Sequence, residues 1–187
     1  VGQGFNDDLT GLDAINRSSP HRAATGFIGL LNLFRARDNF RPGWEIGGAQ
    51  FTKGVVPFET DKLRMLNGAH SALAYIGLQR GHAFVHQAIA DPYIMALANT
   101  LMRDEAANSL QTAAGQNLAS YADALIARFA NPALDHRLIQ IAMDGSQKIP
   151  QRWLETLAFH QQQGRQCSAI LEAIAAWIVH IRGATHV

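Results

Sequence analysis

The fold of this chain is decided by residues 62–77, which read KLRMLNGAHSALAYIG. Their apolar members recur at roughly helical spacing and predict a helix over 59–80 that stops at Gly81. Glu59 and Asp61 lie in the first turn of this helix, where the helix dipole favours carboxylates. The stretch therefore predicts a long helix that also carries several polar side chains capable of chemistry.

Three of these side chains can face one cleft along one side of the helix: Lys62, Asn67 and His70. On a straight helix at about 100° per residue, they lie near roughly 0°, 140° and 80° around the axis. A lysine that is partly removed from water can act as a general base near neutral pH, and an amide and an imidazole can hold an oxygen that gains charge. These roles suit hydride chemistry at a secondary alcohol without a metal. The alternative is a partly exposed helix with a surface lysine, a capping-type asparagine and a hydrogen-bonded core histidine, and spacing alone leaves both interpretations open.

A second polar stretch, residues 144–152, reads DGSQKIPQR. It is typical of a tight turn that runs into a helix N-terminus, for which Ser146 is the expected cap. Lys148 and Arg152 are four residues apart and so share a face, where two cations beside helix N–H groups can hold a carboxylate or hydroxyls. The alternative is a capped helix start with two solvated basic residues.

The rest of the chain after residue 57 also reads as helical, with proline and glycine at the boundaries and no clear strand. The predicted helices cover 84–90, 91–110, 115–130, 133–143, 146–164 and 168–182. Residues 1–57 are richer in glycine and turn signals, with a possible helix over 23–37 and an extended segment over 49–57 that Pro57 stops. We therefore predict a mainly α, multi-helical fold.

Composition excludes several classes of protein. The chain has 187 residues, a net charge of +1 and 48% apolar residues, which excludes a disordered chain and gives no reason to expect nucleic acid. A single cysteine excludes an internal disulfide and a thiolate zinc site, and the histidines show no metal-ligand pattern, so we expect no metal. The first residues lack a charged region followed by an apolar one, so we expect no signal peptide, and the longest apolar stretches are too short to span a bilayer. We expect a cytoplasmic protein without a membrane partner.

Two motifs together resemble the long-chain mannitol dehydrogenase family. The first is Lys62-x4-Asn67-x2-His70 within residues 62–77, and the second is the stretch 131–152, NPALDHRLIQIAMDGSQKIPQR, at the expected distance downstream. The stretch 37–59, RDNFRPGWEIGGAQFTKGVVPFE, resembles the entry to the helical C-terminal domain of this family. The wording of the second motif is closer to the fructuronate reductase and bacterial mannitol dehydrogenase branch.

The resemblance implies NAD- or NADP-dependent interconversion of a secondary alcohol in a linear sugar acid or polyol with its ketone. It makes Lys62 the general base, Asn67 and His70 the groups that position the substrate oxygen, and Lys148 a contact to substrate hydroxyls. Some polyol-oxidising members have an arginine where this chain has Gln140. From charge and position we assign Arg152 to the carboxylate of a sugar acid, and we expect D-mannonate and D-fructuronate as the substrate pair.

The resemblance also implies a Rossmann nucleotide-binding domain, for which the chain lacks the length. We predict a partial remnant of that domain over 1–37, a linker over 38–57 and the helical substrate domain over 58–187. The cofactor would then be bound mainly by a domain absent from this chain, and the isolated chain would be inactive. The alternatives are a mannitol 2-dehydrogenase and a non-catalytic helical fragment, and the oligomeric state stays open.

Overall fold

The computed structural model describes residues 55–113 and 115–183. The chain divides into two compact units, Val1–Glu59 and Thr60–Val187, and nearly all described residues belong to the second. Within the described ranges there are helices but no named strand, and the only extended pairing is an isolated antiparallel bridge between Phe84 and Arg137. The prediction of a mainly α, multi-helical fold is confirmed.

The predicted helix over 59–80 forms as three consecutive segments. These are α3 (Val56–Asp61), the π-helical η2 (Lys62–Asn67) and α4 (Gly68–Gln79). The prediction that an extended segment reaches Pro57 is wrong at its end, because α3 begins at Val56, and proline is tolerated in the first helical turn where its missing N–H is not needed. Gly81 ends the helix with a φ of 80°, as the sequence predicted.

The remaining helices follow with short connections. The Asp91 carboxylate caps α6 by accepting a hydrogen bond of 2.9 Å from the Tyr93 N–H, and α11 ends at Ile181, before Gly183; both boundaries follow the prediction. The described elements are α5 (Val85–Ala90), α6 (Pro92–Asn99), η3 (Thr100–Ala106), η4 (Ala107–Ser109), α7 (Leu118–Phe129), α8 (Leu138–Ala142), α9 (Gly145–Ile149), η5 (Pro150–Leu154), α10 (Glu155–Gln162) and α11 (Ser168–Ile181).

Two predicted boundaries are wrong. The helix expected over 133–143 is reduced to α8, because the backbone before it pairs elsewhere: the Val85 N–H donates to the His136 carbonyl and the Leu138 N–H donates to the Ala83 carbonyl. The predicted cap Ser146 lies inside α9, whose cap is Asp144 with a φ of 56°. Aspartate tolerates this left-handed conformation better than most residues do.

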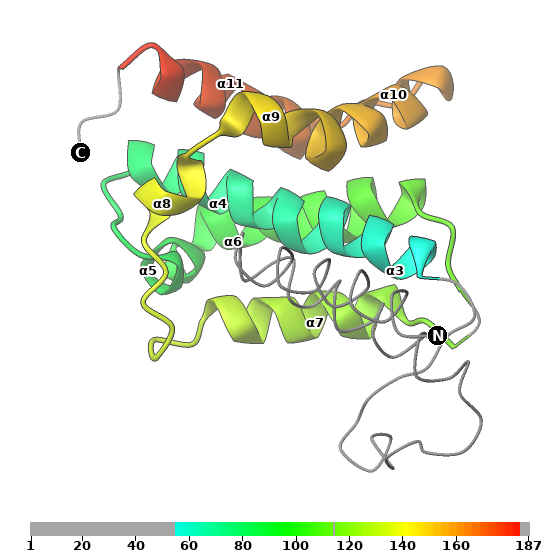
Figure 1. The fold of residues 1–187 in the computed structure, drawn as a ribbon, viewed down its shortest axis with the longest axis horizontal. Coiled ribbons are helices and arrows are strands. Elements are labelled where there is room, and N and C mark those ends of the chain that lie inside the picture. Colours follow the sequence, from blue (N-terminus) through cyan, green and yellow to red (C-terminus); the bar gives the residue numbers. More distant parts are fainter. Residues whose placement is uncertain (1–54, 114, 184–187) are drawn as a thin grey trace, which may run out of the picture. The chain divides into compact units, whose positions relative to one another are not determined.

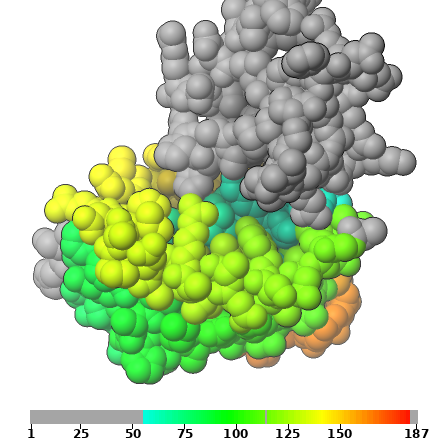
Figure 2. All heavy atoms as spheres, turned by 90° about the horizontal axis from the view of Figure 1, so that it is seen from below, coloured from blue at the N-terminus to red at the C-terminus, as the bar shows by residue number. Residues whose placement is uncertain are grey.

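Helix α4 is the centre of the second unit, and every residue from Gly68 to Leu78 is buried. It packs against α11 and α8, and also against α5 and α6, while α7 runs along the opposite side of the unit from α9, α10 and α11 (Figure 1). Figure 2 views the molecule from below and shows α7, coloured yellow-green, across that face. Trp153 and Cys167 are fully buried.

The described helices include none that is both long enough and apolar enough to cross a membrane. The predictions for 23–37 and for the Rossmann remnant over 1–37 lie outside the described residues, as does most of the predicted linker over 38–57.

Candidate active site

The site is built on η2, where the helix changes from α to π geometry. The Gly68 N–H donates to the Leu63 carbonyl, five residues earlier, and to the Met65 carbonyl, three residues earlier, whereas an α-helix bonds to the carbonyl four residues earlier. A π turn places residues i and i+5 on nearly the same side of the helix. Lys62 and Asn67 are such a pair, so they point in closer directions than the sequence-based estimate for a straight α-helix allowed.

Asn67 is the most informative of the predicted site residues. Its side chain is buried, with 5% of the residue exposed, and its Oδ1 atom has no hydrogen-bond partner among the described residues. A buried amide oxygen without a partner costs about 1–3 kcal/mol of folding free energy, and such groups are rare. The arrangement therefore favours a ligand hydroxyl as the missing donor.

His70 lies one helical turn after Asn67 and is also buried. Its ring stacks on Phe129 of α7, with centroids 5.4 Å apart and planes at 19°, and it lies 5.8 Å from the His136 ring. Helix α7 and the segment before α8 thus fix the imidazole plane. Lys62 is half-buried at the start of η2.

Arg152 of η5 reaches the helix that carries these residues. Its Nη1 donates to Ser71 Oγ, and it lies 3.4 Å from the Asn67 carbonyl oxygen. The structure gives Arg152 no carboxylate partner in the described ranges, and burial lowers the pKa of its guanidinium. Sequence reasoning missed Ser71, although its position four residues after Asn67 places it on the same helix face.

Lys148 is half-buried in α9, which follows the turn at Asp144, and its Nζ donates to the Met143 carbonyl. Burial lowers the pKa of its amine, and the positive charge of Arg152 lowers it further, while Asp144 opposes both effects. The two predicted cations therefore lie close enough for the charge of Arg152 to act on the Lys148 amine. Arg152 faces Asn67, whereas Lys148 is held against its own turn.

The Asp144–Gly145 turn is fixed by close packing on α4. The Tyr75 hydroxyl donates to the Ala142 carbonyl at 3.0 Å, and a Cβ atom at Gly145 would clash with Tyr75 Oη and with Trp177 Nε1. Glycine is therefore required here for space. This contact sets the distance between the turn that carries Lys148 and the helix that carries His70.

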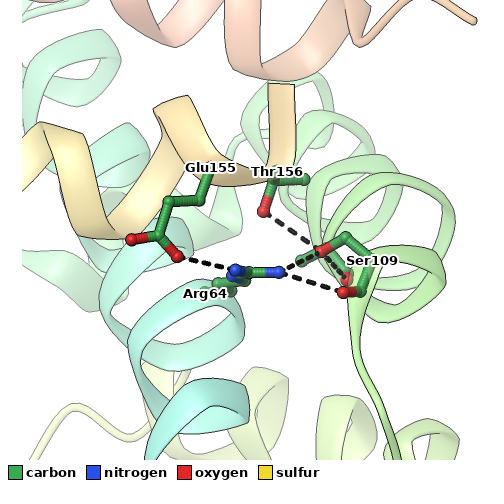
Figure 3. Close-up of polar contacts among 5 residues, drawn as sticks. Arg64, Ser109, Glu155 and Thr156 are labelled. Atoms are coloured by element: carbon green, nitrogen blue, oxygen red, sulfur yellow. Dashed lines mark hydrogen bonds and ion pairs between the residues drawn. The ribbon is translucent and has the colours of Figure 1, made fainter. Parts of the chain in front are cut away.

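Three π-helical segments meet beside the site: η2 packs against both η3 and η5. Arg64 of η2 ties this region together (Figure 3). Its Nη1 donates to the Ser109 carbonyl at 2.9 Å and to Ser109 Oγ at 3.1 Å, and its Nη2 forms an ion pair of 2.7 Å with Glu155. On the next turn, Trp153 Nε1 donates to the Gly68 carbonyl at 3.1 Å. These bonds hold η2 in place from two sides.

Comparison with known proteins gives consistent matches. The family model of the mannitol dehydrogenase C-terminal domain matches residues 54–186. Two proteins of Escherichia coli strain K12, the oxidoreductase YeiQ and D-mannonate oxidoreductase, are 48% and 46% identical over 149 residues, which is 78% of this chain but 30% and 31% of theirs. The chain thus spans about a third of the length of the curated relatives it matches.

Solved structures agree with the sequence matches. The ternary complex of Pseudomonas fluorescens mannitol 2-dehydrogenase with NAD and D-mannitol superimposes with a TM-score of 0.70 and 35% identity, covering 77% of this chain and 29% of that one. A substrate-free D-sorbitol dehydrogenase gives a TM-score of 0.73 at 30% identity, covering 77% of this chain and 30% of that one.

Proposed function

Because this chain belongs to the mannitol dehydrogenase family through its C-terminal domain, we propose that it supplies the substrate half of an NAD- or NADP-dependent dehydrogenase of linear sugar acids or polyols. The observation that carries the proposal is the buried Asn67 Oδ1, which has no hydrogen-bond partner among the described residues. Asn67 lies in η2 together with Lys62, and His70 lies in α4, which continues the same helix. A hydroxylated substrate can donate the missing hydrogen bond to this oxygen.

The proposed reaction assigns one role to each residue. In oxidation, the neutral Lys62 amine takes the proton of the substrate hydroxyl. The carbon that bears this hydroxyl gives a hydride to the oxidised cofactor, and a carbonyl forms. The Asn67 amide holds the reacting end through a donated and an accepted hydrogen bond, and the His70 ring stabilises the oxygen as its charge changes. Reduction runs through the same contacts in reverse. Lys148 would bind a hydroxyl farther along the chain of the substrate.

The substrate we favour is a sugar acid of the D-mannonate and D-fructuronate type. Arg152 is a partly buried cation beside the Asn67 carbonyl, with no ion pair in the described part of the chain, so a carboxylate is its natural partner. The 46% identity to D-mannonate oxidoreductase supports the same choice. Mannitol is the alternative substrate, supported by the structural match to mannitol 2-dehydrogenase.

The polar groups described above fit a hydroxylated substrate, and we assign none of them to the cofactor. When bound, NAD or NADP supplies the acceptor and donor of the hydride. We propose that residues outside the helical unit hold it. Dinucleotide phosphates bind in Rossmann domains where a strand leads into a helix N-terminus. The described residues form no such strand–helix unit.

The test is the variant Lys62→Ala in the full-length protein that carries this sequence. We expect the turnover number to fall at least about 100-fold at every pH, the usual contribution of a general base. The matched control is Arg165→Ala, which removes an exposed cation from the connection before α11 and should leave turnover unchanged. Unchanged turnover of Lys62→Ala across the pH range would refute the role of the lysine as the general base.

A further inference from the structure

Two consecutive residues of η5 bind the helix backbone at the end of the π-helical segment η2. Trp153 Nε1 donates to the Gly68 carbonyl at 3.1 Å, and Arg152 Nη1 donates to the carbonyl of the preceding residue, Asn67, at 3.4 Å. These two carbonyls lie where the π geometry of η2 ends and α4 begins. The donors of η5 therefore meet the helix at the boundary between its two geometries.

Trp153 is better placed than Arg152 to fix this boundary. Its side chain is fully buried, and its ring packs edge-on against Tyr75 of α4, with centroids 6.1 Å apart. Gly68 leaves the indole free to reach the backbone, since a Cβ atom there would already lie 3.5 Å from Trp153 Nε1. The shorter bond thus comes from a side chain that packing holds in one position, whereas Arg152 also donates to Ser71.

The helix geometry before the boundary decides which way Lys62 and Asn67 point. A π turn brings these two residues to nearly the same side of the helix, whereas a straight α-helix separates them by about 140° around its axis. The Gly68 N–H reports which geometry is present. It donates to the Leu63 carbonyl in the structure, and in an α-helix it would donate to the Arg64 carbonyl.

We propose that Trp153 is a positioning residue of the site: its bond to the Gly68 carbonyl holds the π turn of η2 and so keeps Lys62 and Asn67 on one side of the helix. Without this bond, η2 returns to α geometry and the two side chains separate. Trp153 acts through the helix backbone and does not touch the substrate. This inference rests on the proposed function, which gives Lys62 and Asn67 their roles.

The first experiment measures the helix geometry and needs no turnover. NMR couplings across hydrogen bonds identify the carbonyl that accepts each N–H, and they can be recorded on the 187-residue chain. Trp153→Phe keeps an aromatic ring but loses the indole N–H, so we expect the coupling of the Gly68 N–H to move from the Leu63 to the Arg64 carbonyl. The matched control is Trp177→Phe, which removes an indole from α11 and should leave the Leu63 coupling in place.

Two results of this measurement would overturn the proposal. One is a Gly68 N–H that stays coupled to the Leu63 carbonyl in Trp153→Phe, and the other is an equal change in Trp177→Phe. The unchanged chain gives a further reading that does not depend on a variant that folds. Its Trp153 indole N–H must couple to the Gly68 carbonyl, and the absence of this coupling also overturns the proposal.

The second experiment measures turnover in the full-length protein that carries this sequence. Trp153→Phe should lower kcat at least about 10-fold, because a misplacement of about 1 Å can cost about 100-fold. In the Lys62→Ala background, the same change should cost less than about twofold, since the position of the base then no longer matters.

A residue that only stabilises the fold would cost the same in both backgrounds. Equal losses, with Lys62→Ala itself lowering turnover, therefore overturn the positioning role of Trp153. Unchanged turnover of Lys62→Ala refutes the proposed base instead. The couplings of the Gly68 N–H are measured without turnover, so the two proposals fail separately.

Discussion

At the scale of single residues, Asp61 makes the stability of the fold depend on pH. Its pKa is about 6 in the folded chain and 3.8 as a free side chain, so the folded state binds the proton more tightly. The contribution of Asp61 to the free energy of unfolding is therefore highest below about pH 4 and is lost as the pH rises through 6, by up to about 3 kcal/mol. Asp61→Asn should remove this part of the dependence.

Urea denaturation of the 187-residue chain at several pH values measures this effect. Asp123→Asn, which removes an exposed carboxylate on α7, serves as the matched control. A wild-type curve that rises between pH 4 and 6, or a curve that Asp61→Asn leaves unchanged, would contradict the prediction.

Arg152 separates the two candidate substrates. If it binds the carboxylate of a sugar acid, Arg152→Gln should lower kcat/KM for D-mannonate by about 10- to 100-fold, the contribution of a charged hydrogen bond, and leave D-mannitol nearly unaffected. Ser71→Ala is the matched control, because it removes the Arg152 partner but keeps the charge. Equal losses on both substrates would show that Arg152 only supports the Asn67 backbone.

At the scale of elements, Arg64 holds the π-helical segment η2 against η4 and α10 (Figure 3). Arg64→Met should destabilise the chain by about 1–3 kcal/mol, because it leaves the Ser109 carbonyl without this donor in a partly buried place. Glu155→Gln should cost less than about 1 kcal/mol, since the Glu155 side chain is 60% exposed. Thermal unfolding of both variants measures the difference, and equal losses would argue against the Ser109 bond as the main contribution.

The helices that the sequence predicts well are those with local signals at their ends. Asp91 followed by Pro92 marks the start of α6, and Gly81 and Gly183 mark two ends with positive φ. The region 133–137 could not be predicted from such signals, because its backbone pairs with residues 83–85, about fifty positions earlier. Long-range pairing of this kind leaves no periodic trace in the sequence.

The candidate site shows the same division. Lys62, Asn67 and His70 follow from their spacing on one helix, but the π turn that brings Lys62 and Asn67 to one side depends on packing against η3 and η5. The bond between Arg152 and Ser71 joins residues 81 positions apart, and the bond from Gln116 to the Asp61 carboxylate joins residues 55 positions apart. Each of these features is tertiary, and helical spacing contains no information about it.

At the scale of the whole molecule, the helical unit is expected to recognise substrate and not cofactor. Its described residues form no strand leading into a glycine-rich turn, and the chain matches about a third of the length of its relatives. We therefore predict that the 187-residue chain has no measurable affinity for NAD or NADP in calorimetric titrations, and the full-length protein that carries it serves as the positive control. A dissociation constant in the micromolar range for the 187-residue chain, about 8 kcal/mol of binding free energy, would require a nucleotide site within these residues and contradict the proposed division of labour.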